Sequence, residues 1–173
     1  KDVDLAASNQ GYRLGKYEIK IGAKGALSND YVVFRYADIL MMKAECLLRT
    51  NHEDDAATIV TEVRQRSFKV NPAKATVTGS QLLLGSSYNY GFVVNGVVTE
   101  ATGGADIQYG RFLDELGWEF AAEGRRRTDL IRFGVYHTKT WMNHRPTSLD
   151  KALFPIPQAE MNKNPNLTQN PSY

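Results

Sequence analysis

Three glutamates recur at four-residue intervals in the second half of the chain: Glu115, Glu119 and Glu123. On an α-helix this spacing places the three carboxylates on one face, about 6 Å from one another. Two carboxyl groups roughly 5 to 10 Å apart can act as acid and base in the hydrolysis of a glycosidic bond. The two groups of such a pair normally face each other across a cleft, whereas these three follow one another along a single helix. We therefore favour a structural role and keep glycoside hydrolysis as the alternative.

Arginines close in sequence supply the opposite charge, and a guanidinium beside a carboxylate keeps it ionised. These arginines are Arg111, Arg125, Arg126, Arg127 and Arg132. We predict that Glu123, Arg126 and Asp129 hold the turn after Gly124 against the first helix, with Arg35 and Asp38 as their counterparts. The predicted ion-pair network consists of Arg35, Asp38, Glu115, Glu119, Glu123, Arg126, Asp129 and Arg132.

The other reactive residues match no known catalytic or metal-binding pattern. His52, His137 and His144 lack the four-residue spacing of a zinc-binding helix, and the sequence has no phosphate-binding glycine loop or nucleophile motif. Cys46 lies in an apolar helical pattern without a residue beside it that would activate its thiol. We therefore expect no catalytic residue, no metal site and no cofactor, and hence a non-enzymatic binding protein.

The length and net charge of the chain narrow the class of protein further. The chain has 173 residues, of which 42% are hydrophobic and 23% charged, as expected for one globular domain with a hydrophobic core. Lysine and arginine number 21 against 19 acidic residues, and a net charge of +2 is too small to favour binding to a nucleic-acid backbone. We expect no nucleic-acid partner.

Two groups combine aromatic rings with amides, as a sugar-binding surface does. The first is Tyr88, Asn89, Tyr90 and Phe92, and the second is Trp141 and Asn143, followed by His144 and Arg145. Flat rings pack against the C–H face of a sugar, and amides bond its hydroxyls. The first group is the preferred candidate. The alternative is that these rings only cover the hydrophobic core, as most aromatic rings do.

Periodicity predicts the elements that must position these residues. Residues 34–68 have apolar residues every three or four positions on both sides of a polar interruption at 50–55, which predicts a helical hairpin. The small residues Ala44 and Ala56 fall where the two helices approach most closely. Their spacing resembles the helix pair of a tetratricopeptide repeat.

The remaining segments differ in composition. Residues 71–105 are glycine-rich, and Asn95-Gly96 between β-forming residues predicts a β-hairpin. Residues 106–134 predict a helix over 106–123, with Asp106 as N-cap and Gly124 just after its end, followed by a charged turn. Residues 146–173 contain prolines that predict an extended tail. Residues 1–30 predict loop with one short strand over 17–21.

Three segments together resemble the SusD/RagB family of outer-membrane nutrient-binding lipoproteins, in the C-terminal part of its members. They are residues 35–45 continuing to Val63-Arg64-Gln65-Arg66, residues 113–134, and residues 153–160 with the closing run 164–173. The chain departs from the family pattern at Leu116, where an arginine is usual, and at Ser172, where a glycine is usual.

The resemblance implies a mainly α-helical, SusD-like fold with tetratricopeptide-like helix pairs and an N-terminal part that is absent from this chain. It implies a protein tethered to the cell surface at the outer membrane by an N-terminal lipid. The implied partners are an oligosaccharide ligand and a SusC-like TonB-dependent transporter, on which the protein acts as a lid. Capture of peptides is the alternative within this family.

Overall fold

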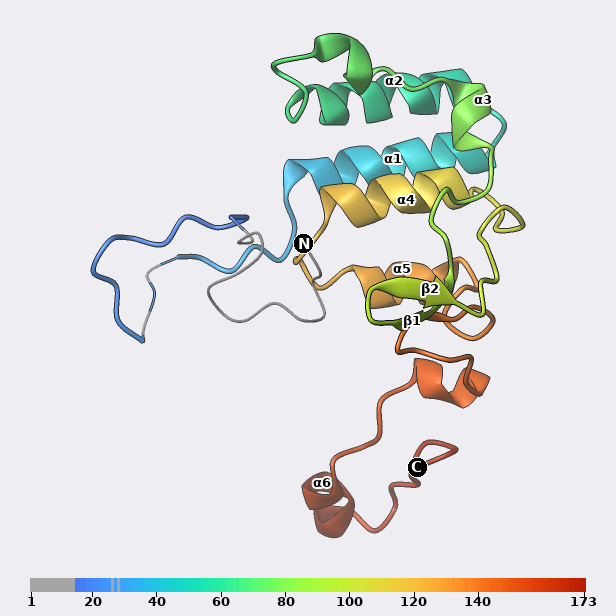
Figure 1. The fold of residues 1–173 in the computed structure, drawn as a ribbon. Coiled ribbons are helices and arrows are strands. Elements are labelled where there is room, and N and C mark those ends of the chain that lie inside the picture. The colour runs from blue at the N-terminus through green and yellow to red at the C-terminus, as the bar shows by residue number, and fades with distance from the viewer. Residues whose placement is uncertain (1–14, 26, 28) are drawn as a thin grey trace.

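The computed structural model describes residues 15–25, 27 and 29–173. It is mainly helical and carries one small three-stranded sheet, so the prediction of a mainly helical fold with a small β-hairpin is confirmed (Figure 1). Tyr17 lies in a bend, residues 18–20 have no regular structure and a turn begins at Ile21, so the short strand predicted over 17–21 is wrong.

Helices α1 (Tyr36–Arg49) and α2 (Glu53–Gln65) form a helical hairpin. The α1 helix begins where the Asp38 carboxylate accepts a 2.8 Å hydrogen bond from the Arg35 backbone N–H. It ends at Thr50, whose backbone N–H bonds the carbonyls of Cys46 and Leu47. Ala44 and Ala56 are fully buried, so the small residues allow the two helices to pack closely.

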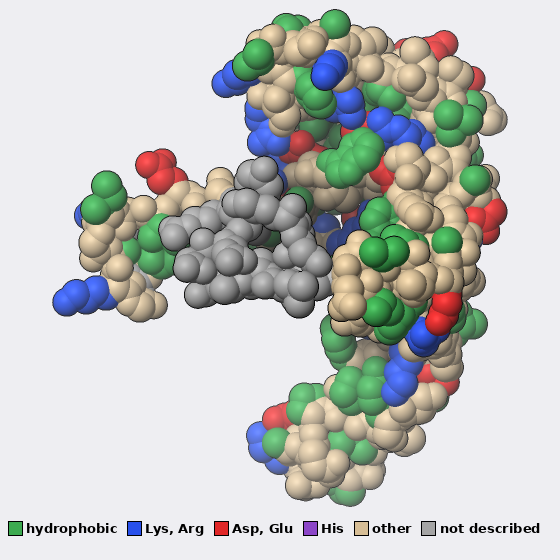
Figure 2. All heavy atoms as spheres, in the orientation of Figure 1, with side chains coloured by type: hydrophobic (Ala, Val, Ile, Leu, Met, Phe, Trp, Pro, Cys, Tyr) green, Lys and Arg blue, Asp and Glu red, His purple; other side chains and the backbone are tan. Residues whose placement is uncertain are grey.

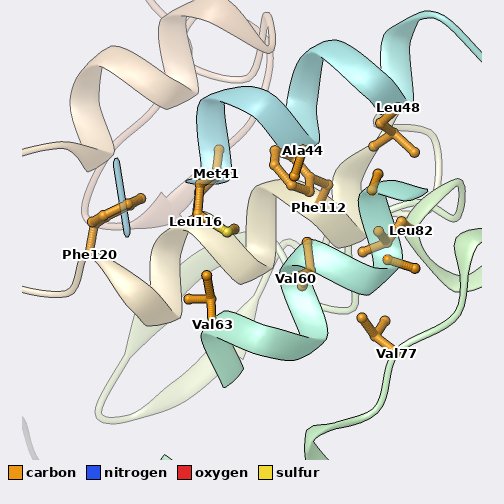
Figure 3. Close-up of a cluster of buried hydrophobic side chains, with 12 residues drawn as sticks. Met41, Ala44, Leu48, Val60, Val63, Val77, Leu82, Phe112, Leu116 and Phe120 are labelled. Carbon is orange, nitrogen blue, oxygen red and sulfur yellow. The ribbon is translucent and has the colours of Figure 1, made fainter. Parts of the chain in front are cut away.

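Helices α1, α2 and α4 (Gly110–Glu119) pack together, and the main core fills the space among the three helices (Figure 3). Met41 and Leu48 come from α1, Val60 from α2, and Phe112 and Leu116 from α4. The short helix α5 (Arg126–Arg132) follows α4 and packs with it over a second, smaller core cluster.

The observed α4 is shorter than the predicted helix over 106–123. Asp106 is not its N-cap: Tyr109 has a left-handed backbone with φ of 54°, and Asp106 pairs with Lys139 at 2.6 Å. The helix stops at Glu119 because Ala122 also has a positive φ, of 62°. Glu123 therefore lies in the turn after α4 and not on the helix that carries Glu115 and Glu119.

The predicted β-hairpin is present as β1 (Gly91–Val94) and β2 (Val97–Thr99), paired antiparallel. Asn95 and Gly96 have φ of 49° and 75°, as the predicted turn requires. A third strand, β3 (Trp141–Met142), pairs in parallel with β1 and gives the strand order β2-β1-β3. Two residues are too few to show strand periodicity, so the sequence did not predict β3.

The remaining elements are short: 3-10 helices η2 (Pro72–Ala75) and η3 (Leu149–Ala152), and helices α3 (Gly79–Leu82) and α6 (Gln158–Lys163). The C-terminal tail therefore contains two short helical segments between extended stretches, and it projects from the helical body (Figure 1). Arg127 holds the base of the tail through the carbonyls of Lys151 and Ala152 and lies over the Phe154 ring at 4.1 Å.

Candidate functional site

Two glutamates of α4 are each held by guanidinium groups from two elements. Glu115 forms ion pairs with Arg64 of α2 and with Arg111 of α4, each with a distance of 2.6 Å from Nη1 to Oε1. Glu119 receives Arg66 at 2.6 Å, from just beyond α2, and Arg35 at 2.6 Å, from the residue before α1. These ion pairs join the ends of three helices that pack against one another.

Glu123 continues this arrangement from the turn after α4. Nε and Nη2 of Arg35 each donate a 2.8 Å hydrogen bond to Glu123, and Lys16 Nζ lies 2.6 Å from Glu123 Oε1. Burial acts to raise the pKa of Glu123, but the hydrogen bonds from Arg35 and Lys16 outweigh it and hold that pKa below its ordinary value. The hydrogen bond to Glu123 in turn raises the pKa of Arg35. We call these residues the α4 ion-pair network: Glu115, Glu119, Glu123, Lys16, Arg35, Arg64, Arg66 and Arg111.

This geometry argues against acid–base chemistry at the three glutamates. A general acid must hold a proton near neutral pH, which requires a raised pKa. The pKa of Glu123 is instead lowered. Glu115 and Glu119 each accept hydrogen bonds from a guanidinium group on another element. The carboxylates are therefore suited to joining helices rather than to protonating a leaving group.

A second ion-pair cluster joins α1 to α5. Asp38 pairs with Arg125, and Arg132 pairs with Asp129 at 3.0 Å and with Glu45 at 2.7 Å. Burial raises the pKa of Asp129 above its ordinary value, against the hydrogen bond from Arg132. Sequence analysis missed Glu45 because it lies in an otherwise apolar stretch of α1.

Arg126 has a different role from the one predicted. Its Nη1 donates a 2.7 Å hydrogen bond to the backbone carbonyl of Leu113, and its Nη2 lies 3.4 Å from the hydroxyl of Tyr90. Its guanidinium also lies where a side chain on Gly117 would be. Arg126 thus joins α5 to α4 through a carbonyl and a phenol, and Glu123 is held by Arg35 instead.

The sheet brings together the two predicted groups of ligand-binding residues. The β1–β3 pairing places Gly91 opposite Trp141 and Phe92 opposite Met142, although about fifty residues separate the two strands along the chain. We call Tyr88, Asn89, Phe92, Trp141 and Asn143, which surround this pairing, the sheet cluster. Sequence analysis had treated them as two alternative sites.

The rings of the sheet cluster differ in what they expose. Tyr90, a member of the first predicted group, is 1% exposed, so its ring packs in the core instead of facing a ligand. Tyr88 is 42% exposed and meets the Tyr90 ring edge to face at 4.8 Å. Trp141 is half-buried and stacks on His144 at 3.9 Å between ring centroids.

Charged and polar side chains complete the surroundings of the sheet cluster. Arg145 lies over the Phe92 ring at 4.2 Å and pairs with Glu100 at 2.6 Å. Asn89 and Asn143 are exposed. Exposed amides beside partly open rings can bond the hydroxyls and pack on the C–H face of a sugar.

Asp114 of α4 positions the start of the sheet cluster, and sequence analysis missed it. Its buried carboxylate accepts hydrogen bonds from the Ser86 hydroxyl at 2.5 Å and from the Ser87 backbone N–H at 2.7 Å. The Ser86 hydroxyl oxygen accepts in turn from the Tyr88 backbone N–H at 3.1 Å. The fixed position of Tyr88 therefore depends on a buried carboxylate 26 residues away in the chain.

In the part of the chain that the structure describes, no group of three or more His, Cys, Asp or Glu residues is placed to hold a metal ion. No helix among the same residues is both long enough and apolar enough to cross a membrane.

Comparison with known proteins places the chain in a family. The SusD family model matches residues 1–150 and 137–173. The starch-binding protein SusD of Bacteroides thetaiotaomicron is 28% identical over 152 residues, which are 83% of this chain and 22% of that protein. A SusD-like protein of Formosa agariphila is 30% identical over 151 residues, 82% of this chain and 24% of that protein. The chain thus spans about a quarter or less of the curated relatives it matches. Because the family model matches it from end to end, the chain belongs to the SusD family.

Proposed function

We propose that this chain is part of a non-enzymatic surface protein that binds an oligosaccharide or polysaccharide for nutrient uptake. The observation that carries the proposal is the match of the whole chain to the SusD family model. The relative from Bacteroides thetaiotaomicron, itself named a starch-binding protein, supports a carbohydrate ligand. We further propose that the protein is lipid-anchored at the outer membrane and delivers its ligand to a SusC-like TonB-dependent transporter. Within it, α1 and α2 form a tetratricopeptide-like unit.

The sheet cluster is the proposed contact with the ligand in this chain. Tyr88 offers an exposed ring and Trp141 a partly open one, and Asn89 and Asn143, which flank strands β1 and β3, offer exposed amides. The buried Asp114 fixes the segment that carries Tyr88, so the ring is held in place before the ligand arrives. Such preorganisation lowers the entropy cost of binding.

A glycan array probed with the complete protein tests this proposal. The variant Tyr88→Ala, Trp141→Ala is expected to bind at least tenfold more weakly, because each removed ring loses its stacking on the sugar. Tyr36→Ala is the matched control, since Tyr36 is an exposed tyrosine that lies on α1 rather than in the sheet. Tyr90 is unsuitable as a target because its ring is buried and its removal would destabilise the fold.

The other outcomes of the array are equally informative. Unchanged glycan binding by the double variant would contradict the sheet cluster as the ligand contact. Binding to peptides and to no glycan would replace the carbohydrate proposal by capture of peptides. Appearance of new reducing ends in the bound glycan would contradict a non-enzymatic role and support a glycoside hydrolase.

A further inference from the structure

A small pocket opens between α2 and α4, away from the residues of the sheet cluster. It has a volume of about 250 Å³, and its lining includes Arg64, Ser67, Phe68, Glu115, Trp118 and Glu119. Figure 2 shows basic and acidic side chains beside apolar ones in the hollow below α2. The volume lies below the range of roughly 300 to 1,000 Å³ typical of sites for drug-sized ligands. A pocket of this size suits one ring of a longer ligand.

Two aromatic rings contribute to the pocket lining. Trp118 is 55% exposed although it lies on α4, most of whose residues are buried. Phe68 comes from the segment after α2 and is half-buried. One guanidinium lies over each ring, Arg111 over Trp118 at 4.6 Å and Arg64 over Phe68 at 4.9 Å. The pocket therefore combines aromatic surface with an electropositive surround.

The pocket lining itself holds one basic and two acidic side chains, Arg64, Glu115 and Glu119. Each of these two carboxylates pairs with two guanidinium groups, so the charges around the pocket do not cancel. Five basic side chains contact the three carboxylates of the α4 ion-pair network: Lys16, Arg35, Arg64, Arg66 and Arg111. The C-terminal ends of α2 and α4 each add about half a negative charge, and the start of α1 adds about half a positive charge. Among the described residues the network thus keeps an excess of about one to two positive charges.

Arg66 lies beside the pocket, because it pairs with Glu119 of the pocket lining, and it has donors to spare. Its side chain is 57% exposed, and in the described part of the chain only Nη2 is engaged, with the two oxygens of Glu119. A guanidinium carries five N–H donors in a planar fork that suits carboxylate and sulfate groups. The adjacent residue Ser67 lines the pocket and offers a hydroxyl.

We propose that the α2–α4 pocket binds one acidic sugar residue of the captured glycan. The sugar ring packs against Trp118 and Phe68, and its anionic group, a uronate carboxylate or a sulfate ester, takes the open donors of Arg66. The inference rests on the proposed function and adds that the captured glycan is acidic. It also gives a role to Trp118, which the sequence placed only within a segment typical of the family.

Calorimetric titration of the complete protein tests the inference with three probes of similar length: oligogalacturonate, sulfated dextran and neutral dextran. At low salt, at least one acidic probe is expected to bind at least tenfold more tightly than neutral dextran. This advantage should shrink as NaCl is raised, because the Arg66 charge is exposed and screened by salt. Whichever acidic probe binds more tightly identifies the anionic group.

Substitutions then locate the binding. Arg66→Gln and Trp118→Ala are each expected to weaken binding of the acidic probe at least tenfold and to leave neutral dextran within twofold. Arg66→Gln keeps Glu119 paired with Arg35, and Trp118→Phe keeps a ring at the pocket if the alanine variant proves unstable. Lys43→Gln is the charge-matched control, because Lys43 is exposed on α1 and does not line the pocket.

The possible failures are distinguishable. Equal affinity for acidic and neutral probes, or an Arg66→Gln variant that behaves like Lys43→Gln, would overturn the inference and leave the proposed function standing. Failure of the protein to bind any saccharide would overturn both. Competition by an acidic peptide that depends on Arg66 would overturn the saccharide assignment of the pocket.

Discussion

At the scale of single residues, the ion pairs differ mainly in how deeply they are buried. The Glu123 side chain is 9% exposed and is held by two donors from Arg35 and by Lys16. The Glu100–Arg145 pair has equally short contacts, but both side chains are more than half exposed. Solvent screening makes an exposed pair worth little, whereas loss of a partner in a buried pair leaves an uncompensated charge.

We predict that Glu123→Gln lowers the free energy of unfolding by about 2 kcal/mol at pH 7, the value of hydrogen bonds to a charged group. The folded-state pKa of Glu123 lies below its unfolded value. Its stabilisation is therefore present above the unfolded pKa of about 4.3 and is lost as the pH falls through the folded pKa. Urea denaturation at pH 7, 5 and 3 should show the difference between wild type and variant shrinking at pH 3.

Glu100→Gln is the control for this prediction and should change the unfolding midpoint little. If Glu100→Gln lowers the free energy of unfolding as much as Glu123→Gln does, burial is not what distinguishes the two ion pairs. If Glu123→Gln lowers the free energy of unfolding as much at pH 3 as at pH 7, the charge of Glu123 is not the source of the stabilisation.

At the scale of elements, the start of α4 passes very close to the segment that carries the sheet cluster. A Cβ added to Gly110 would collide with the backbone nitrogen of Ser86, and one added to Gly85 would collide with the backbone of Ala105. The backbone N–H of Arg111 donates a 3.0 Å hydrogen bond to the Leu84 carbonyl in the same contact. Gly110 thus allows the start of α4 to lie against residues 85–86, and Gly85 allows Ala105, before α4, to lie against the same segment.

We predict that Gly110→Ala lowers the free energy of unfolding by about 1 to 3 kcal/mol, the usual cost of overpacking. In an open helix the same change would stabilise by up to about 1 kcal/mol, so the sign of the effect tests the close contact. Gly25→Ala is the control, because a Cβ there meets no atom within 4 Å. Equal or greater stability of Gly110→Ala in guanidinium denaturation would disprove the contact.

At the scale of the whole molecule, the outer face of α1 leaves apolar side chains in solvent. Tyr36, Ile39 and Met42 follow one another at helical spacing and are all exposed, as is Phe34 just before the helix. A neighbouring pocket of about 510 Å³ is lined by Phe34 and Met42 and extends this apolar surface toward α5. Contiguous exposed apolar surface favours association.

We predict that the chain, expressed as these 173 residues, self-associates with rising concentration through this face of α1. Ile39→Glu should shift the population toward monomer in light scattering coupled to size exclusion, because it places a charge in the middle of the apolar surface. Val70→Glu, at a fully exposed site beyond α2, should leave association unchanged. A monomer at every concentration, or equal effects of the two changes, would contradict the prediction.

The sequence by itself determined what depends on neighbouring residues. The three- and four-residue periodicity located α1 and α2, and the Asn95-Gly96 turn located the hairpin. The motif segments indicated the family that the whole-chain match then showed. Helical periodicity and turn preferences act over a few residues, so they can be recognised without knowing the rest of the fold.

Only the tertiary structure decided which residues meet. Arg64 and Glu115 lie 51 positions apart, and Arg66 and Glu119 lie 53 apart, so no local pattern could have paired them. The same holds for β3 beside β1, for the burial of Tyr90, and for the pocket where Trp118 and Phe68 meet. Any of several arginines could pair with a given carboxylate, and only the packing of the helices decides which of them lie within reach.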